Sequence, residues 1–146
     1  MNAATIFFLA DDDADDIGMF CEALSEVDRG VVCRTAENGR SAIALLSDPD
    51  ERKPDVIFLD INMPVLNGWD CLKWIKSQAP LMRIPVIMYS TSSSKRDIDL
   101  AAQHGALCLM TKPESYSGLK NILQLIMENI PGNLSEALRG LPNVTI

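Results

Sequence analysis

Residues 56–64 read Val-Ile-Phe-Leu-Asp-Ile-Asn-Met-Pro, and the topology of the chain can be worked out from this segment. Four consecutive apolar residues, mostly strand formers, end abruptly on the carboxylic acid Asp60. A run without polar alternation is typical of a strand buried on both faces of a parallel sheet. Asp60 would then stand at the carboxyl end of that strand, where open α/β sheets bind ligands. Taken alone, the acid could equally cap the next helix or solvate a turn.

Four further apolar runs predict strands, at residues 5–10, 31–36, 85–89 and 106–111. Apolar residues at helical spacing follow each predicted strand and predict five helices. This alternation is typical of a doubly wound parallel sheet in a single α/β domain. The run 31–36 alone ends without an acid, a hydroxyl or an amine, so we place it at the edge. The prediction is a flavodoxin-like (βα)5 fold with five strands in the order 2-1-3-4-5.

The first predicted strand runs directly into five aspartates within residues 11–16. Helix-start electrostatics explains Asp15 and Asp16, because carboxylates suit the positive end of a helix dipole. Asp11 and Asp12 need another explanation, since two carboxylates at the end of a buried strand repel each other unless a cation screens them. We therefore predict that Asp11 and Asp12 bind a divalent cation.

The fourth predicted strand ends on Ser90, and the fifth ends on Lys112-Pro113. A serine in the following loop is expected as a helix N-cap, and a lysine beside a proline can be exposed loop. Their places at two strand ends distinguish these residues, because the carboxyl ends of such strands converge at the switch point of the sheet. The fold therefore predicts one pocket that contains Asp11, Asp12, Asp60, Ser90 and Lys112.

This constellation resembles the receiver domain of two-component response regulators, especially the single-domain, chemotaxis-type form. The resemblance covers residues 5 to about 130 and rests on the acid pair, the Leu-Asp-x-Asn-Met-Pro motif, Ser90 and Lys112-Pro113 in that order. It implies that Asp60 accepts a phosphoryl group, that Ser90 bonds a phosphoryl oxygen and that Lys112 pairs with the phosphorylated aspartate. It also implies a cis peptide bond before Pro113. The implied Mg²⁺ ligands are Asp11, Asp12, Asp60 and the backbone carbonyl of Asn62.

The resemblance implies a switch that catalyses only its own phosphorylation and dephosphorylation. The phosphodonor would be a sensor histidine kinase or a phosphotransfer protein. One departure from the family concerns Leu109, where an aromatic side chain that swings inward is common. Leucine has no ring to swing, so we expect the signal to pass through residues 91–95 and the fourth helix. The output surface would be the face of the fourth helix, fifth strand and fifth helix, read by a partner protein or a second copy forming a homodimer.

Two alternatives from other classes share the nucleophile or the fold. An aspartate-nucleophile phosphatase or hydrolase usually carries a second acid two residues after the nucleophile, where this chain has Asn62. A flavodoxin-like, flavin-binding module needs a phosphate-binding loop after the first strand. The aspartates of residues 11–16 would repel a phosphate group there. The sequence disfavours both alternatives.

The composition bounds the remaining possibilities. A chain of 146 residues fits one domain, with a receiver domain at residues 1–130 and a tail at 131–146 that has room for one short helix. The net charge of -7 disfavours nucleic acid or an anionic membrane as a partner. The four cysteines lie far apart, which predicts reduced thiols in a cytoplasmic protein. No apolar run is long enough to span a bilayer.

Overall fold

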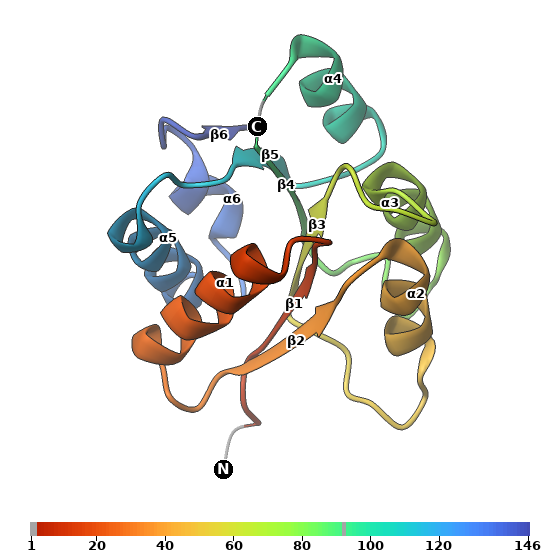
Figure 1. Cartoon of the computed structure of the whole chain (residues 1–146), viewed down its shortest axis with the longest axis horizontal. Helices are drawn as coiled ribbons and strands as arrows, with labels where there is room; N and C mark the ends of the chain where they lie inside the picture. Colours follow the sequence, from red (N-terminus) through yellow and green to blue (C-terminus); the bar gives the residue numbers. More distant parts are fainter. Residues whose placement is uncertain (1–2, 92) are drawn as a thin grey trace.

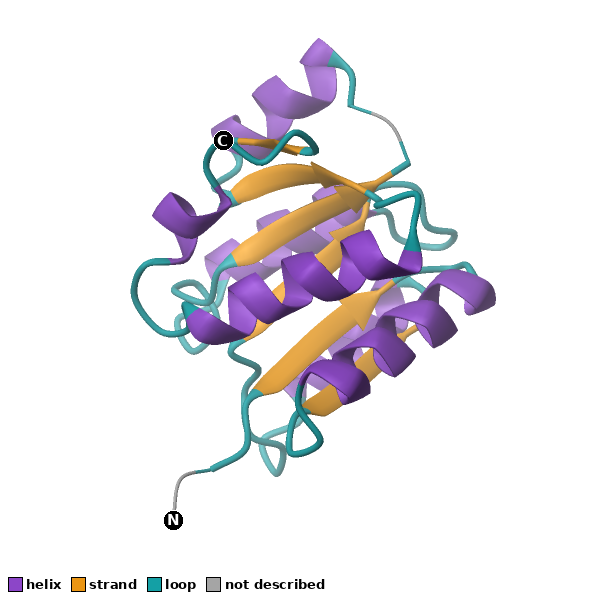
Figure 2. Ribbon diagram, turned by 90° about the vertical axis from the view of Figure 1, so that its left-hand side faces the viewer, coloured by secondary structure: helices purple, strands orange, loops and turns teal. Residues whose placement is uncertain are grey.

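A twisted sheet runs through the middle of the molecule, and helices cover both of its faces (Figures 1 and 2). The computed structural model describes residues 3–91 and 93–146. The strands are β1 (Ile6–Ala10), β2 (Val32–Ala36), β3 (Val56–Asp60), β4 (Val86–Ser90), β5 (Cys108–Thr111) and β6 (Val144–Thr145). The helices are α1 (Ala14–Val27), α2 (Gly39–Ser47), α3 (Gly68–Ser77), α4 (Lys95–Gln103), α5 (Tyr116–Glu128) and α6 (Leu134–Leu138).

The hydrogen-bonded order of the strands is β2-β1-β3-β4-β5-β6. Strands β1 to β5 are parallel, which confirms the doubly wound, flavodoxin-like class and the predicted order 2-1-3-4-5. The prediction of five strands is wrong by one, because β6 pairs antiparallel with β5 and places Val144 opposite Met110. β6 has two residues and follows Gly140 and Pro142, so it is too short to show any periodicity in the sequence.

The two faces of the sheet are covered by different helices. Helices α1 and α5 pack on one face, and α2 and α3 pack on the other (Figure 1). Every residue of β1, β3 and β4 is buried, which explains why these strands show no polar alternation. The aromatic rings of Phe20, Phe58 and Tyr89 contact one another under α1 at centroid distances of 5.0–6.0 Å. The polar residues at the carboxyl ends of these strands are therefore supported by a tightly packed core.

The C-terminal tail returns to the sheet at the outer edge of β5. Leu134 and Leu138 of α6 are 5% and 0% exposed, and both belong to the core on the α1 and α5 side. Beyond α6, the backbone N–H of Thr111 donates to the carbonyl of Asn143 (2.8 Å), and the Asn143 side chain donates to the carbonyl of Thr111 (2.9 Å). The tail thus covers the edge of β5 that would otherwise be unpaired.

Capped helix starts fix the loops at the carboxyl edge of the sheet. The Asp13 side chain accepts hydrogen bonds from the amides of Asp15 and Asp16, so Asp13 is the N-cap of α1. The Asn67 side chain caps α3 in the same way. The backbone N–H of the next residue, Gly68, donates to the carbonyl of Ile61 at 2.9 Å. This bond ties the start of α3 to the loop that follows Asp60.

None of the helices in the described part of the chain has the length and apolar character that a bilayer span requires.

Candidate functional site

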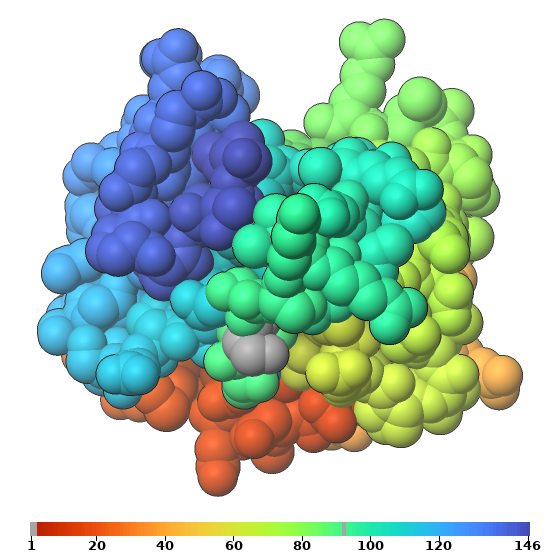
Figure 3. All heavy atoms as spheres, turned by 90° about the horizontal axis from the view of Figure 1, so that it is seen from above, coloured from red at the N-terminus to blue at the C-terminus, as the bar shows by residue number. Residues whose placement is uncertain are grey.

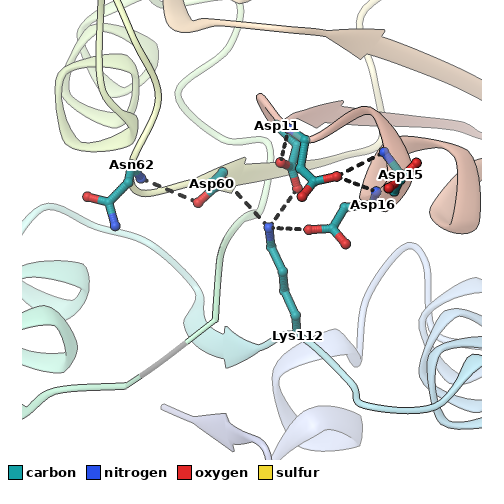
Figure 4. A network of polar contacts seen from close by, with 7 residues as sticks. Asp11, Asp15, Asp16, Asp60, Asn62 and Lys112 are labelled. Atoms are coloured by element: carbon teal, nitrogen blue, oxygen red, sulfur yellow. Dashed lines mark hydrogen bonds and ion pairs between the residues drawn. The ribbon is translucent and has the colours of Figure 1, made fainter.

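Polar residues at the ends of four strands lie at the carboxyl edge of the sheet, and Figure 4 shows those that follow or end β1, β3 and β5. Asp11 directly follows β1, Asp60 is the last residue of β3, and Lys112 directly follows β5. Ser90 is the last residue of β4, is 4% exposed, and accepts a 2.7 Å hydrogen bond on its carbonyl from the backbone N–H of Lys112. The structure brings Asp11, Asp60 and Lys112 into direct contact, with Ser90 beside them.

The ammonium group of Lys112 lies between three carboxylates (Figure 4). Its Nζ is 2.9 Å from Asp11 Oδ2, 2.9 Å from Asp16 Oδ2 and 3.3 Å from Asp60 Oδ2. The Lys112 side chain is only 12% exposed, and Nζ lies 5.5 Å from the centre of the Tyr89 ring. One cation therefore holds the acidic pocket together from the side of β5.

Asp11 is the most deeply buried acid of the pocket. It is 0% exposed, its backbone N–H donates to the carbonyl of Ala36 (3.0 Å), and its Oδ1 accepts from the backbone N–H of Asp13 (2.9 Å). Its other oxygen, Oδ2, faces Lys112 but accepts no hydrogen bond from any residue that the structure describes. A buried carboxylate oxygen with unused acceptor capacity is suited to a metal ion.

The carboxylates of Asp11, Asp12 and Asp60 fit a divalent cation. One oxygen from each lies within 4.8 Å of the others, so a single ion can contact all three. Asp11 and Asp60 are buried while Asp12 is exposed, which leaves one side of the cluster open to water and to a ligand. An all-oxygen, partly hydrated set of this kind suits Mg²⁺ or Mn²⁺. Asn62 borders the cluster, and its backbone N–H donates to Asp60 Oδ1 at 3.3 Å.

The pKa of the Asp60 carboxyl is shifted by its buried position at the end of β3. Burial raises the pKa of Asp60 to about 6; the Lys112 ammonium acts in the opposite direction, and the Asp11 carboxylate adds to the increase. For Lys112, burial alone would lower the pKa. The close carboxylates of Asp16 and Asp11, together with the charge of Asp60, outweigh burial, so the pKa of Lys112 is raised above its ordinary value. Without a metal ion, Asp60 therefore takes up a proton at a higher pH than an ordinary aspartate does.

The raised pKa of Asp60 predicts how stability depends on pH in the absence of metal. The folded chain binds a proton at Asp60 up to about pH 6, whereas the unfolded chain releases it near the ordinary value of 3.8. Stabilisation by the protonated carboxyl is therefore complete below pH 3.8 and is lost as the pH rises through 6. Between pH 4 and pH 7, the parent should lose about 2–3 kcal/mol of stability relative to Asp60→Asn.

Urea unfolding of both proteins in a chelator, at half-unit pH steps, measures this difference. Asp50→Asn is the control, because Asp50 is exposed and lies in the loop between α2 and β3. A constant difference between the parent and Asp60→Asn across this pH range would show that Asp60 keeps an ordinary pKa.

Asp16 belongs to the site, although the sequence analysis explained it only as a helix-start residue. With Asp13 as N-cap, Asp16 is the third residue of α1 and directs its carboxylate to Lys112 at 2.9 Å. The position of Asp16 in the sequence could have indicated this role. A helix that starts at the carboxyl end of a strand turns side chains of its first turn toward the pocket. Among the described residues, the only cis peptide bond precedes Pro131, so the implied cis bond before Pro113 is wrong.

The fold and the pocket together define a doubly wound α/β domain with a cluster of acidic residues at its switch point. Residues 7–124 match the response regulator receiver domain family, and the chain belongs to that family. Receiver domains are phosphoacceptor domains that bind Mg²⁺ or Mn²⁺ at an acidic pocket. The comparisons favour neither the phosphatase alternative nor the flavin-binding alternative.

Several relatives have a similar length. Response regulator Rcp1 of Synechocystis sp. is 28% identical over 129 residues, which cover 84% of this chain and 86% of Rcp1. Protein PilH of Pseudomonas aeruginosa is 33% identical over 92 residues, which cover 63% of this chain and 74% of PilH. Other relatives are longer: the match to a protein-glutamate methylesterase/protein-glutamine glutaminase of Methanococcoides burtonii covers only 28% of that protein, at 35% identity.

Solved structures agree with these matches. The phosphorylated cyanobacterial phytochrome response regulator RcpA superposes with a TM-score of 0.78 at 33% identity, over 87% of this chain and 94% of RcpA. The Mn²⁺-bound form of Rcp1 superposes with a TM-score of 0.71 at 25% identity, over 86% of this chain and 93% of Rcp1. The chain is thus a receiver domain homologous to single-domain response regulators.

Proposed function

We propose that this chain is a phosphorylation switch in which Asp60 accepts the phosphoryl group in a Mg²⁺-dependent reaction. The observation that carries the proposal is the position of the Asp60 carboxylate, at the end of β3 between Lys112 and the acidic cluster. A sensor histidine kinase or a phosphotransfer protein would supply the phosphoryl group in the cytoplasm. The chain would catalyse its own phosphorylation and dephosphorylation but would turn over no separate substrate.

The metal ligands in this proposal are the carboxylates of Asp11, Asp12 and Asp60 and the backbone carbonyl of Asn62. Bound Mg²⁺ would screen the charge of the incoming phosphoryl oxygens. The formal charges of three carboxylates, one ammonium and one divalent cation cancel. Asp16 adds a further negative charge, but its side chain is 34% exposed, so water screens it.

The chain's own residues would then act in three ways. A carboxylate oxygen of Asp60 attacks phosphorus, the bond from phosphorus to the donor's histidine nitrogen breaks, and that nitrogen regains a proton from water. Lys112, already 3.3 Å from Asp60 Oδ2, would neutralise part of the charge on the acyl phosphate. The Ser90 hydroxyl would donate a hydrogen bond to a phosphoryl oxygen. The acyl phosphate makes the pocket about one charge more negative, which gives the switch its driving force.

Phosphorylation of Asp60 is tested with Mg²⁺ and a small acyl-phosphate donor, followed by intact mass and peptide mapping. We expect one phosphoryl group on Asp60, lost in Asp60→Asn and on chelation of Mg²⁺. Asp12→Ala should slow the reaction, because the exposed Asp12 side chain offers a ligand oxygen to the ion. Asp50→Asn should react like the parent. Modification at another residue, or none with several donors, would rule out this function.

The output surface in this proposal is formed by α4, β5 and α5. Leu109 is 1% exposed and packs in the core on the α2 and α3 side, which supports a switch without an inward-swinging ring. All residues of α4 are described, and only Ala101 among them is buried, so α4 can shift without repacking a large core. The C-terminal segment lies beside α4 on this face, so a partner would also contact β6 (Figures 1 and 3).

A beryllofluoride complex, which mimics the acyl phosphate, tests this route. Amide NMR signals of residues 91–105 should shift more than those of α2. Helix α2 packs near β2, at the opposite end of the strand order from β5 (Figure 1). Ser92 belongs to this stretch but lies outside the described residues. Leu109→Tyr should change partner affinity and leave phosphorylation of Asp60 largely unchanged. Shifts confined to the pocket, or a Leu109→Tyr variant that cannot be phosphorylated, would contradict the route.

A further inference from the structure

Two of the four cysteines meet outside the acidic pocket. Cys21 lies in α1, Cys33 lies in β2, and their sulfur atoms are 2.7 Å apart. Both residues are half-buried, whereas Cys71 and Cys108 are 1% and 3% exposed and lie in the core. The pair is therefore the one place, among the described residues, where two thiols are in contact and within reach of a small reagent.

We propose that Cys21 and Cys33 form a reversible disulfide by exchange with a low-molecular-weight disulfide such as oxidised glutathione. A disulfide bond is about 2.04 Å long, so the two sulfurs need to approach each other by only about 0.7 Å. The packing of α1 against β2 holds them at this distance, so little backbone movement is required. Disulfides in cytosolic proteins are mostly transient and redox-sensing, and a reversible exchange fits that pattern.

The two thiols have different roles in the exchange. A hydrogen bond from the Cys33 thiol lowers the pKa of Cys21, while the same contact and burial raise the pKa of Cys33. The Cys21 thiolate is therefore the nucleophile that attacks the small disulfide, forms a mixed disulfide and releases one thiolate. Cys33 then loses its proton and attacks the Cys21 sulfur, which expels the second small thiol. The protein loses two hydrogen atoms, and the small disulfide gains them.

The disulfide would connect two elements that lead to the acidic pocket. Helix α1 carries Asp16, which contacts Lys112, and β2 ends at Ala36, whose carbonyl accepts the hydrogen bond of the Asp11 amide. Closing the loop between Cys21 and Cys33 restricts the unfolded chain. The thermal midpoint of the oxidised protein should therefore be about 5–10 °C higher. Asp60 lies on β3, outside both connected elements, so the disulfide does not depend on the proposed phosphorylation.

The test treats the full chain with oxidised glutathione and traps free thiols by alkylation. We expect a protein that has lost two hydrogen atoms, a Cys21–Cys33 linked peptide, and reversal by dithiothreitol. In Cys33→Ser, one glutathionyl group should remain attached to Cys21, because no second thiol can displace it. In Cys21→Ser, Cys33 should react far more slowly. Because both positions are half-buried, circular dichroism is needed to check that each variant is folded.

Three outcomes would overturn the proposal. One is a parent protein that stays fully reduced while Cys33→Ser is also unmodified. The second is a stable glutathionyl adduct on the parent, since it would show that Cys33 cannot reach Cys21. The third is preferential modification of Cys71 or Cys108. Phosphorylation of Asp60 is measured separately, so failure of the disulfide and failure of the switch are distinguishable.

Discussion

Lys112→Met should lower the stability of the metal-free protein by about 3 kcal/mol at pH 8, because the variant leaves a buried acidic cluster without its cation. In the parent, Lys112 Nζ contacts Asp11, Asp16 and Asp60 within 3.3 Å. Methionine keeps most of the apolar stem but removes the charge. The carboxylates of Asp11 and Asp60, which are both buried, would then repel each other.

Two conditions should restore most of this loss. Addition of Mg²⁺ supplies the missing positive charge, so the variant should gain more stability from Mg²⁺ than the parent does. Lowering the pH also helps: the pKa of Asp60 should rise further without Lys112, so the folded variant takes up a proton that the unfolded chain does not bind. Stability that comes from this protonation is present at low pH and is lost as the pH rises through the folded pKa.

Urea unfolding at pH 5 and pH 8, with a chelator or with Mg²⁺, measures these effects. Lys120→Met is the matched control, because Lys120 is 39% exposed and its 3.5 Å ion pair with Glu26 lies on the surface. Lys120→Met should lower the free energy of unfolding by less than about 1 kcal/mol in every condition. Equal losses in the two variants, or no response of Lys112→Met to Mg²⁺, would show that Lys112 does not hold the cluster together.

The sequence allowed the fold class and the strand order to be predicted because the central strands carry continuous apolar runs. The chemistry at their ends then identified β2 as the edge. The same reasoning selected Asp60 and Lys112, since a strand end fixes where a side chain lies. It missed β6, because two residues carry no periodicity and their pairing with β5 depends on how α6 packs.

Two other contacts were missed for a different reason. Asp16 and the Cys21–Cys33 pair depend on the rotation of α1 about its axis and on its distance from neighbouring elements. Apolar periodicity indicates which side of α1 faces the core, but it does not give the position of a polar side chain at the border of that face. The spacing of the cysteines in the sequence likewise hid their contact, because the connection from α1 to β2 folds Cys33 back against α1.

Gly68→Ala should strongly disrupt the loop that follows Asp60. A Cβ atom at this position would lie 2.2 Å from the carbonyl oxygen of Asp60 and 3.0 Å from the Cα of Ile61. Both contacts are to backbone, so no side chain can rotate away to relieve them. Either α3 or the loop after Asp60 must move, and the hydrogen bond from the Gly68 amide to the Ile61 carbonyl would be lost.

We expect Gly68→Ala to lose about 2–3 kcal/mol of stability, the usual cost of overpacking a tight site. Because the loop carries Asp60, phosphorylation by a small acyl-phosphate donor should also slow by roughly tenfold or more. Gly18→Ala is the matched control: Gly18 lies in α1, and a Cβ there meets no atom within 4 Å. Alanine is the better helix former, so this variant should gain about 0.5–1 kcal/mol.

Urea unfolding and phosphorylation time courses of the two variants, run beside the parent, test this prediction. The distinguishing result is a loss of both stability and reaction rate in Gly68→Ala, with a gain in stability and an unchanged rate in Gly18→Ala. Asp60 would then depend on a close approach between α3 and its own carbonyl, which only glycine permits. If Gly68→Ala unfolds and reacts like the parent, the loop after Asp60 can move away at no cost, and the site is not held by α3.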